Sequence, residues 1–278
     1  MKDDPFLTPA ELLKQNGLRA NRRLGQNFLQ DEKSLGTIAA LAEIQDTDSV
    51  LEIGAGLGSL TRHLSNYARD VVAVELDINL EGIFHKVLKS YKNVRLVHGD
   101  ILSLSPGDLG LPPNYIVAAN IPYNITSAIL RHLLESEPKP RRIVLTVQEE
   151  VAARICESPP EMSLLALSVQ IYGKPIIAER IPAEAFFPIP QVDSAVVKIE
   201  IYPEPFIPYS VIPVFFKLIK AGFSQKRKTL RNALSAGLHL STSEVETLLH
   251  KANLDPKTRA ETLSLNEWGL LVNSYVNP

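Results

Sequence analysis

Short apolar runs alternate with amphipathic segments through the N-terminal part of the chain. Most of the amphipathic segments repeat apolar side chains at helical spacing, as Ile125, Ile129 and Leu133 do. The apolar runs have the length and β-branched content of buried strands, and they cover residues 49–53, 71–75, 94–97, 115–119 and 142–148. Strands that alternate with helices predict an α/β fold with a parallel, doubly wound sheet. Two later strand-like segments, 176–181 and 194–202, are expected at an antiparallel edge.

A different pattern begins after residue 202. The segment 202–208 reads "YPEPFIP" and resembles a proline-rich joint between domains. Only helical periodicity follows it, in residues 209–222, 226–238, 243–252 and 266–275. We therefore predict a first domain at 1–203 and a small, all-helical domain at 204–278.

The composition is that of a soluble globular protein, with 45% hydrophobic and 22% charged residues. No apolar run approaches the roughly 18 residues that a membrane-spanning helix needs, and the N-terminus lacks the apolar core of a secretory signal. Cys156 is the one cysteine, so an internal disulfide is excluded. We expect a cytoplasmic protein that has no membrane partner and is monomeric.

Basic residues gather in two windows, although the net charge of the chain is −2. No acidic residue interrupts the window between Glu11 and Asp31 or the window between Glu204 and Glu244. The basic residues of the two windows are Lys14, Arg19, Arg22, Arg23, Lys217, Lys220, Lys226, Arg227, Lys228 and Arg231. A solvated surface is one explanation, and contact with nucleic acid phosphates is the other.

A glycine-rich turn follows the first predicted strand, where the sequence reads "EIGAGLG". Gly54, Gly56 and Gly58 allow the backbone to turn tightly and to approach a ligand near a helix N-terminus. Ser59 stands where the dinucleotide fingerprint G-x-G-x-x-G has its last glycine, which argues against a dehydrogenase. The turn alone therefore indicates a nucleotide-like ligand without naming it.

Polar residues stand at the ends of three further predicted strands. Glu75 can accept hydrogen bonds from both hydroxyls of a ribose, and Asp100 can accept one from an adenine amino group. Asn120 ends the fourth strand. Contacts to ribose and adenine without a pyrophosphate fingerprint suggest an adenosine cofactor without a diphosphate, which describes S-adenosylmethionine.

Seven segments together resemble the ribosomal RNA adenine dimethyltransferases, over roughly residues 18 to 275. The segments are "RRLGQNFLQD", "VLEIGAGLGSLT", "VVAVELD", "VHGDIL", "NIPYNITSAIL", "PAEAFFPIPQVDSAVV" and "GFSQKRKTLRNAL". The resemblance implies a Rossmann-like fold that binds S-adenosylmethionine, followed by a helical domain. It assigns the cofactor to Asn27 and Leu29, and to Gly54, Glu75, Asp100 and Asn120.

The resemblance also implies a reaction, the transfer of methyl groups to N6 of two adjacent adenosines near the 3′ end of small-subunit ribosomal RNA. A related group of enzymes methylates large-subunit RNA and confers macrolide resistance, and "NIPY" is frequent there. The longer segments "FFPIPQVDSAVV" and "FSQKRKTLRNAL" look like the small-subunit enzymes. The chain departs from their pattern by lacking a Tyr-Gly pair before "LSVQ". A ribosome-assembly factor without catalysis is a further alternative.

The tetrapeptide "NIPY" supplies the groups that methyl transfer to an adenine amine requires. The amide of Asn120 and a main-chain carbonyl can accept the two amine hydrogens, which frees the nitrogen lone pair, and Pro122 fixes the turn. Tyr123 can stack on a flipped base, and by analogy with the family Phe186 supplies the opposite face. Histidine and cysteine spacings typical of zinc are missing, so no metal is expected. RNA contacts are expected from Arg22, Arg23, Lys226, Arg227, Lys228 and Arg231, the last four along the first turns of a helix.

Overall fold

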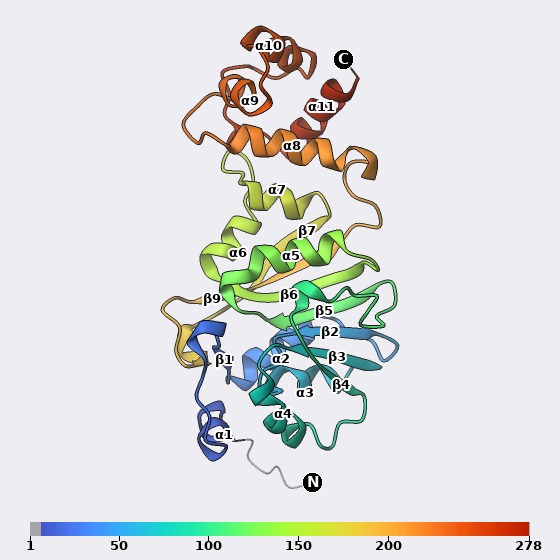
Figure 1. Cartoon of the computed structure of the whole chain (residues 1–278), viewed down its shortest axis with the longest axis vertical. Helices are drawn as coiled ribbons and strands as arrows, with labels where there is room; N and C mark the ends of the chain where they lie inside the picture. Colours follow the sequence, from blue (N-terminus) through green and yellow to red (C-terminus); the bar gives the residue numbers. More distant parts are fainter. Residues whose placement is uncertain (1–6, 278) are drawn as a thin grey trace. The chain divides into compact units, whose positions relative to one another are not determined.

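The computed structural model describes residues 7–277, which form two compact units (Figure 1). One unit comprises the chain up to Ala152 together with Ile176–Ile201. The other comprises Ala153–Pro175 and the chain from Tyr202 onward. The second unit thus includes an early segment that the sequence pattern placed in the first domain.

Contacts inside the second unit explain why this early segment belongs to it. Helix α7 (Leu164–Gln170) packs against α8 (Ile212–Phe223). The amide of Met162 donates a 2.8 Å hydrogen bond to the carbonyl of Glu261, about a hundred residues later. The segment is therefore joined to the C-terminal helices by helix packing and by a backbone hydrogen bond. The periodicity of the sequence indicates neither contact.

A seven-stranded sheet forms the centre of the first unit, with the strand order β4-β3-β2-β5-β6-β9-β7. Its strands are β2 (Ser49–Ile53), β3 (Asp70–Glu75), β4 (Val94–His98), β5 (Tyr115–Asn120), β6 (Pro140–Gln148), β7 (Gly173–Ile181) and β9 (Ser194–Ile201). The first five are paired in parallel, while β9 runs antiparallel to β6. The predicted α/β class, with its strands and antiparallel edge, is confirmed.

The order of the strands changes direction at β2, which lies between β3 and β5. Ligands of open α/β sheets bind beyond the carboxyl ends of the strands at such a switch point. The glycine turn leaves β2 at this place, and Glu75 and Asn120 are the last residues of β3 and β5. The topology therefore brings the predicted polar residues to one edge of the sheet.

A second sheet of two short strands was not predicted. Strand β1 (Phe28–Leu29) pairs antiparallel with β8 (Phe186–Phe187), so that Phe28 lies opposite Phe187 and Leu29 opposite Phe186. Neither strand is long enough to show an alternating pattern in the sequence. Their pairing fixes the segment before the main sheet to the segment before β9.

Six helices belong wholly or mainly to the first unit. They are α1 (Pro9–Gln15), α2 (Glu32–Leu41), α3 (Ser59–Ser65), α4 (Glu81–Val87), α5 (Thr126–Glu135) and α6 (Glu149–Ile155). Leu35 and Ile38 of α2 and Leu64 of α3 pack with Val50 and Ile116 of the sheet in one buried cluster. Complete burial of each such side chain contributes about 1.5–3 kcal/mol to stability.

The second unit is helical. Besides α7 and α8 it contains α9 (Leu230–Leu238), α10 (Thr242–Lys251) and α11 (Leu265–Val276). Trp268 is fully buried between these helices, and its ring stacks on Phe223 with a centroid distance of 6.0 Å. The second unit also contains the short 3-10 turns Tyr209–Val211 and Ala260–Thr262.

The first unit contains five such turns, at Arg22–Leu24, Ile78–Leu80, Ile101–Ser103, Tyr123–Ile125 and Ala183–Ala185, within the described residues.

Helices α8 and α9 approach each other closely at one glycine. A Cβ atom on Gly237 would lie 2.6 Å from the Cβ and 2.8 Å from the Cα of Ala221. Any side chain at residue 237 would therefore force the two helices apart. No helix within residues 7–277 has the length and apolar character needed to cross a membrane.

Candidate active site

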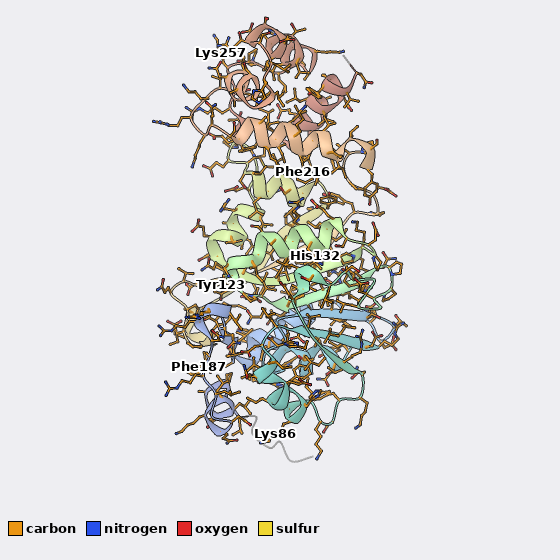
Figure 2. All side chains as sticks on the ribbon, in the orientation of Figure 1. Lys86, Tyr123, His132, Phe187, Phe216 and Lys257 are labelled. Carbon is orange, nitrogen blue, oxygen red and sulfur yellow. The ribbon has the colours of Figure 1, made fainter. Side chains whose placement is uncertain are left out.

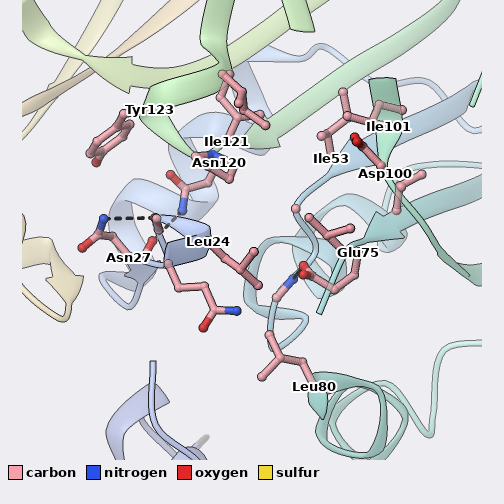
Figure 3. Close-up of a pocket in the computed structure, with 18 of the residues that line it drawn as sticks. Leu24, Asn27, Ile53, Glu75, Leu80, Asp100, Ile101, Asn120, Ile121 and Tyr123 are labelled. Carbon is pink, nitrogen blue, oxygen red and sulfur yellow. Dashed lines mark hydrogen bonds between the residues drawn. The ribbon is translucent and has the colours of Figure 1, made fainter. Parts of the chain in front are cut away.

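A pocket lies at the carboxyl ends of β2, β3 and β5, at the switch point of the sheet (Figure 3). Most of the residues predicted for the cofactor and for catalysis line it, although they come from distant parts of the sequence. These are Asn27, Gly54, Glu75, Asp100, Asn120, Pro122 and Tyr123. Apolar side chains form its walls, among them Leu24, Phe28, Ile53, Leu80 and Ile101.

The floor of the pocket is backbone. Gly54 and Gly56 both have positive φ values, 73° and 55°, which side chains other than glycine rarely adopt. A Cβ atom on Gly56 would lie 3.1 Å from the ring of Phe28, and one on Gly54 would lie 3.4 Å from the carbonyl oxygen of Asn120. The two glycines therefore keep open a space that side chains would fill.

Glu75 is fixed by two backbone hydrogen bonds at the end of β3. Its Oε2 accepts from the amide of Gly56 and its Oε1 from the amide of Asp77, both at 2.8 Å. Burial raises the pKa of this carboxyl, while the two amide bonds act against that rise. Each oxygen has a second lone pair, so the carboxylate can still accept two hydrogen bonds from a ligand.

The orientation of the Asn120 amide follows from its partner. Its Nδ2 donates to the main-chain carbonyl of Asn27 at 3.1 Å, and the Nδ2 of Asn27 donates to the carbonyl of Gly25 at 3.2 Å. Because a carbonyl only accepts, the nitrogen of Asn120 must face it. The side-chain oxygen of Asn120 is thereby left as an acceptor at the pocket (Figure 3).

Pro122 and Tyr123 complete this side of the pocket. Pro122 lies close to the glycine turn, since its Cδ would be 3.7 Å from a Cβ on Gly54. The hydroxyl of Tyr123 shares a 2.7 Å hydrogen bond with the hydroxyl of Ser194, the first residue of β9, which is fully buried. Burial raises the pKa of the Tyr123 hydroxyl. One end of the ring is thus fixed in the protein, and the residue borders the pocket.

Asp100 lies at the end of β4, where its Oδ1 accepts a 3.0 Å hydrogen bond from the amide of Leu102. This bond caps the turn Ile101–Ser103 and sets the direction of the carboxylate. The other oxygen of Asp100 is available to a donor in the pocket. Asp100 and Glu75 therefore present acceptors from neighbouring strands, as β4 pairs directly with β3.

The sequence matches a known protein family over most of its length. The family model described as ribosomal RNA adenine dimethylase matches residues 17–276. The chain belongs to the ribosomal RNA adenine dimethylase family. The expectation drawn from the seven sequence segments is confirmed, and with it the class of enzyme, a methyltransferase.

Curated relatives of this dimethylase cover nearly its whole length. A protein of Dehalococcoides mccartyi strain CBDB1, named ribosomal RNA small subunit methyltransferase A, is 46% identical over 96% of this chain and 93% of its own. A protein of the same name from Alkaliphilus metalliredigens is 37% identical over 96% of this chain and 97% of its own.

Two solved structures share the fold of this dimethylase. The 23S rRNA methyltransferase ErmE has a TM-score of 0.73 at 27% identity, covering 89% of this chain and 99% of that chain. A dimethyladenosine transferase from Plasmodium falciparum has a TM-score of 0.78 at 24% identity, covering 90% and 98%. The likeness extends over both units of the dimethylase.

Two residues predicted for the cofactor or for catalysis, Leu29 and Phe186, do not line this pocket, although Leu29 lines a smaller cavity next to it. Leu29 is 2% exposed and belongs to the buried cluster beside α2 and α3. Phe186 is 0% exposed and lies in the same cluster, opposite Leu29 in the small sheet. A ring without exposed surface offers no face to a base, so Phe186 does not have the predicted stacking position here. The neighbouring Phe187 is the half-buried residue of the pair.

Sequence reasoning missed a polar link across the pocket of this dimethylase. The Nε2 of Gln26 donates a 2.8 Å hydrogen bond to Asp77, which lies just after β3. Both side chains belong to segments already recognised, "GQNF" and "VELD", but neither residue was assigned a role. The bond connects the segment before β1 to the segment that holds Glu75.

A smaller cavity shares Gly54, Gly56 and Asn120 with the pocket and is also lined by Glu52. Glu52 is 1% exposed in the middle of the sheet, and its Oε2 has no hydrogen-bond partner within residues 7–277. Burial raises the pKa of Glu52 to about 8, and the nearby charge of Glu75 adds to the rise. Glu52 is therefore mostly a neutral acid at pH 7.

Some of the basic residues predicted to contact RNA are exposed in turns, and one is paired with an acidic side chain. Arg22 and Arg23 are exposed in the turn Arg22–Leu24, directly before Leu24 and Gly25 of the pocket wall. Arg231 is in the first turn of α9, where its guanidinium pairs with Glu246. No group of three or more His, Cys, Asp or Glu side chains in the described part of the chain could hold a metal ion.

The basic run at residues 226–228 lies outside the helix in which it was predicted. Helix α9 begins at Leu230, with Thr229 as its N-cap residue, so Lys226, Arg227 and Lys228 are in the turn between α8 and α9. All three are exposed, and the turn is the loop that joins α8 to α9 in Figure 1 and, with side chains drawn, in Figure 2. The prediction that these residues lie along the first turns of a helix is therefore wrong for all three.

Proposed function

We propose that this chain transfers methyl groups from S-adenosylmethionine to N6 of two adjacent adenosines near the 3′ end of small-subunit ribosomal RNA. The observation that carries the proposal is the pocket itself. It combines two carboxylates at neighbouring strand ends with the free oxygen of Asn120 and the ring of Tyr123. These are the acceptors that an adenosine cofactor needs, beside the groups that an adenine substrate needs.

The residues present fit the proposed cofactor. The space kept open by Gly54 and Gly56 brings backbone close to a ligand. Glu75 would accept hydrogen bonds from the ribose hydroxyls, and Asp100 one from the adenine amine. Apolar walls on both sides suit the faces of the adenine ring. When bound, the cofactor supplies an electrophilic methyl group on a sulfonium.

The chain's own contribution to the reaction is positioning. The Asn120 oxygen accepts one hydrogen of the adenine amine, and the Ile121 carbonyl is the candidate acceptor for the other. These bonds draw the amine away from conjugation with the ring, so its lone pair becomes available for attack. Tyr123 stacks on the flipped base, and the proton of the methylated nitrogen leaves to water. Precise placement of the reacting atoms supplies most of the rate.

Contacts to the RNA are proposed from the basic residues outside the pocket. Arg22 and Arg23 adjoin the pocket wall and would neutralise phosphates beside the target adenosine. Lys226, Arg227 and Lys228 are exposed, and their side chains have no hydrogen bond or ion pair within residues 7–277, so their charges are available to phosphates. Arg231 shares its charge with Glu246 and would contribute less.

The choice of the small subunit is supported by the names of the relatives. Proteins named for small-subunit methylation reach 46% identity, while the structure named for 23S RNA reaches 27%. We also propose that the protein acts as a monomer in the cytoplasm, where ribosomal subunits are its partners. An assembly factor without catalysis is disfavoured, because nothing in the pocket replaces the acceptor set.

The test is methylation of unmethylated small and large subunits with labelled cofactor, followed by mass spectrometry of the RNA nucleosides. Dimethyladenosine in the small subunit is expected, and label confined to the large subunit would establish the alternative. Asn120→Ala is the matched control, since it should abolish most turnover while small-subunit binding persists. Binding without label in the wild type as well would indicate an assembly factor.

A further inference from the structure

The loop at residues 188–193 is attached to the pocket at both ends. Before it, Phe187 pairs with Phe28, whose side chain lines the pocket. After it, the hydroxyl of Ser194 forms a hydrogen bond with that of Tyr123, which also lines the pocket. The loop is therefore held at both ends by residues of the pocket lining, and it lies entirely within the first unit.

The loop presents apolar side chains to solvent. Ile189 is 64% exposed, more than any other large apolar side chain in the described residues, and Val192 is 46% exposed. Pro188 and Pro190 flank Ile189 and fix the backbone on both sides of it. The position of this largely exposed isoleucine is thus restricted in advance by its neighbours.

The single charge of the loop is turned toward the protein. Asp193 accepts a 2.9 Å hydrogen bond from the amide of Ala183 through Oδ1, and its carbonyl accepts a 3.0 Å bond from the amide of Glu149. Residues 188–192 contain no charged side chain. The tip of the loop is therefore uncharged, with Gln191 as its one polar side chain, while its base is held by hydrogen bonds.

We propose that Ile189, supported by Val192, is a wedge that packs against the RNA base next to the target adenosine when the target leaves its stack. The inference rests on the proposed function, because a base enters the pocket only if the chain acts on one. Extrusion of a nucleotide loses its stacking on the neighbouring bases, and an apolar side chain inserted beside the gap offsets part of that loss.

The position of the loop favours RNA as the occupant. Phe28 and Tyr123 both line the pocket and both hold the loop, so a base bound in the pocket has the loop beside it, where the loop can meet the neighbouring base. A base has an apolar face of the size that one isoleucine covers. Arg22 and Arg23 lie in the same unit, next to the pocket wall, and would hold the phosphates of the same strand.

The test compares Ile189→Ala with Ile176→Ala, a control in which a 47% exposed isoleucine of β7 is shortened in the same way. Single-turnover methylation of small subunits is measured at saturating enzyme, together with subunit affinity. We expect Ile189→Ala to lower the rate constant about fivefold to tenfold with affinity changed less than about threefold, because a wedge acts on extrusion. Ile189→Phe should restore the rate, since a ring can stack.

Equal rates for wild type and Ile189→Ala, or equal losses for Ile189→Ala and Ile176→Ala, would overturn the wedge. A wild-type dimer in sedimentation that Ile189→Ser dissolves, with the rate unchanged, would assign the loop to a second copy of the chain instead. Ile189→Ala and Ile176→Ala both alter exposed residues. Unchanged cofactor affinity in each variant would show that the pocket is intact. A wild type that methylates neither subunit would refute the proposed function itself, a separate outcome.

Discussion

Glu52 offers a direct test of the electrostatics beneath the pocket. In the folded protein its pKa is about 8, against an ordinary value of 4.5 that applies when the chain is unfolded. Between pH 4.5 and pH 8 the carboxyl of Glu52 therefore keeps its proton in the folded state and loses it in the unfolded state. The stability of the wild type therefore falls as the pH rises from about 4.5 to 8, because the unfolded chain ionises first.

The substitution Glu52→Gln replaces the neutral acid by an amide of nearly the same shape and removes the titration. Linkage between the two pKa values predicts that the free energy of unfolding of the wild type falls by roughly 3–4 kcal/mol between pH 5 and pH 8. The variant lacks this titration and should not show the fall. The stability of the variant relative to that of the wild type should therefore rise steadily with pH. At pH 5 the difference between the two proteins should be small.

Amide hydrogen exchange in β2 is the suitable assay, because it reports the opening of the strand that contains Glu52. The fluorescence of Trp268 is unsuitable, since that residue lies in the helical unit. Opening free energies are compared at several pH values after correction for intrinsic exchange, with Glu137→Gln as the control, whose carboxylate is 71% exposed. Parallel pH profiles for wild type and Glu52→Gln would refute the reasoning and show that Glu52 is ionised at pH 7.

Three further predictions concern the site and the RNA. Glu75→Ala should weaken S-adenosylmethionine binding by about 1–3 kcal/mol in calorimetry, because the ribose loses a charged acceptor; unchanged affinity would remove Glu75 from the site. Tyr123→Phe should slow methylation less than Tyr123→Ala, since the ring remains but the buried Ser194 hydroxyl loses its partner; equal damage would shift the role from the ring to the hydroxyl. Replacing Arg227 and Lys228 by Ala should flatten the log–log salt dependence of small-subunit binding by about one to two units, leaving cofactor affinity unchanged, whereas identical slopes would move the phosphate contacts elsewhere.

The main sheet could be predicted because its parallel strands are buried on both faces. The run 115–119 is apolar throughout, and 49–53 is apolar except for Ser49 and Glu52; the structure begins β5 and β2 at the same residues. Glu75, Asp100 and Asn120 could be placed at one edge for the same reason, since parallel strands carry their ends to a common side. Local sequence was sufficient wherever the structure is regular.

Prediction failed where a partner distant in sequence decides the structure. Which of Phe186 and Phe187 is buried depends on the register of β8 against β1, and two adjacent phenylalanines look alike in the sequence. The start of α9 was placed too early because lysine and arginine are good helix formers. Thr229 caps that helix instead and leaves the basic residues in the turn before it.

The close crossing of α8 and α9 decides the mechanical character of that turn. The missing methyl group at Gly237 lets the two helices touch at Ala221, so the stems of the turn are clamped a short distance apart. The three cationic residues therefore lie in a short turn, residues 224–229, whose two ends are held by packed helices. Part of the entropy of bringing them together is lost when the protein folds, so less would be lost on contact with an anionic strand. A freely moving tail of the same composition would not have this advantage.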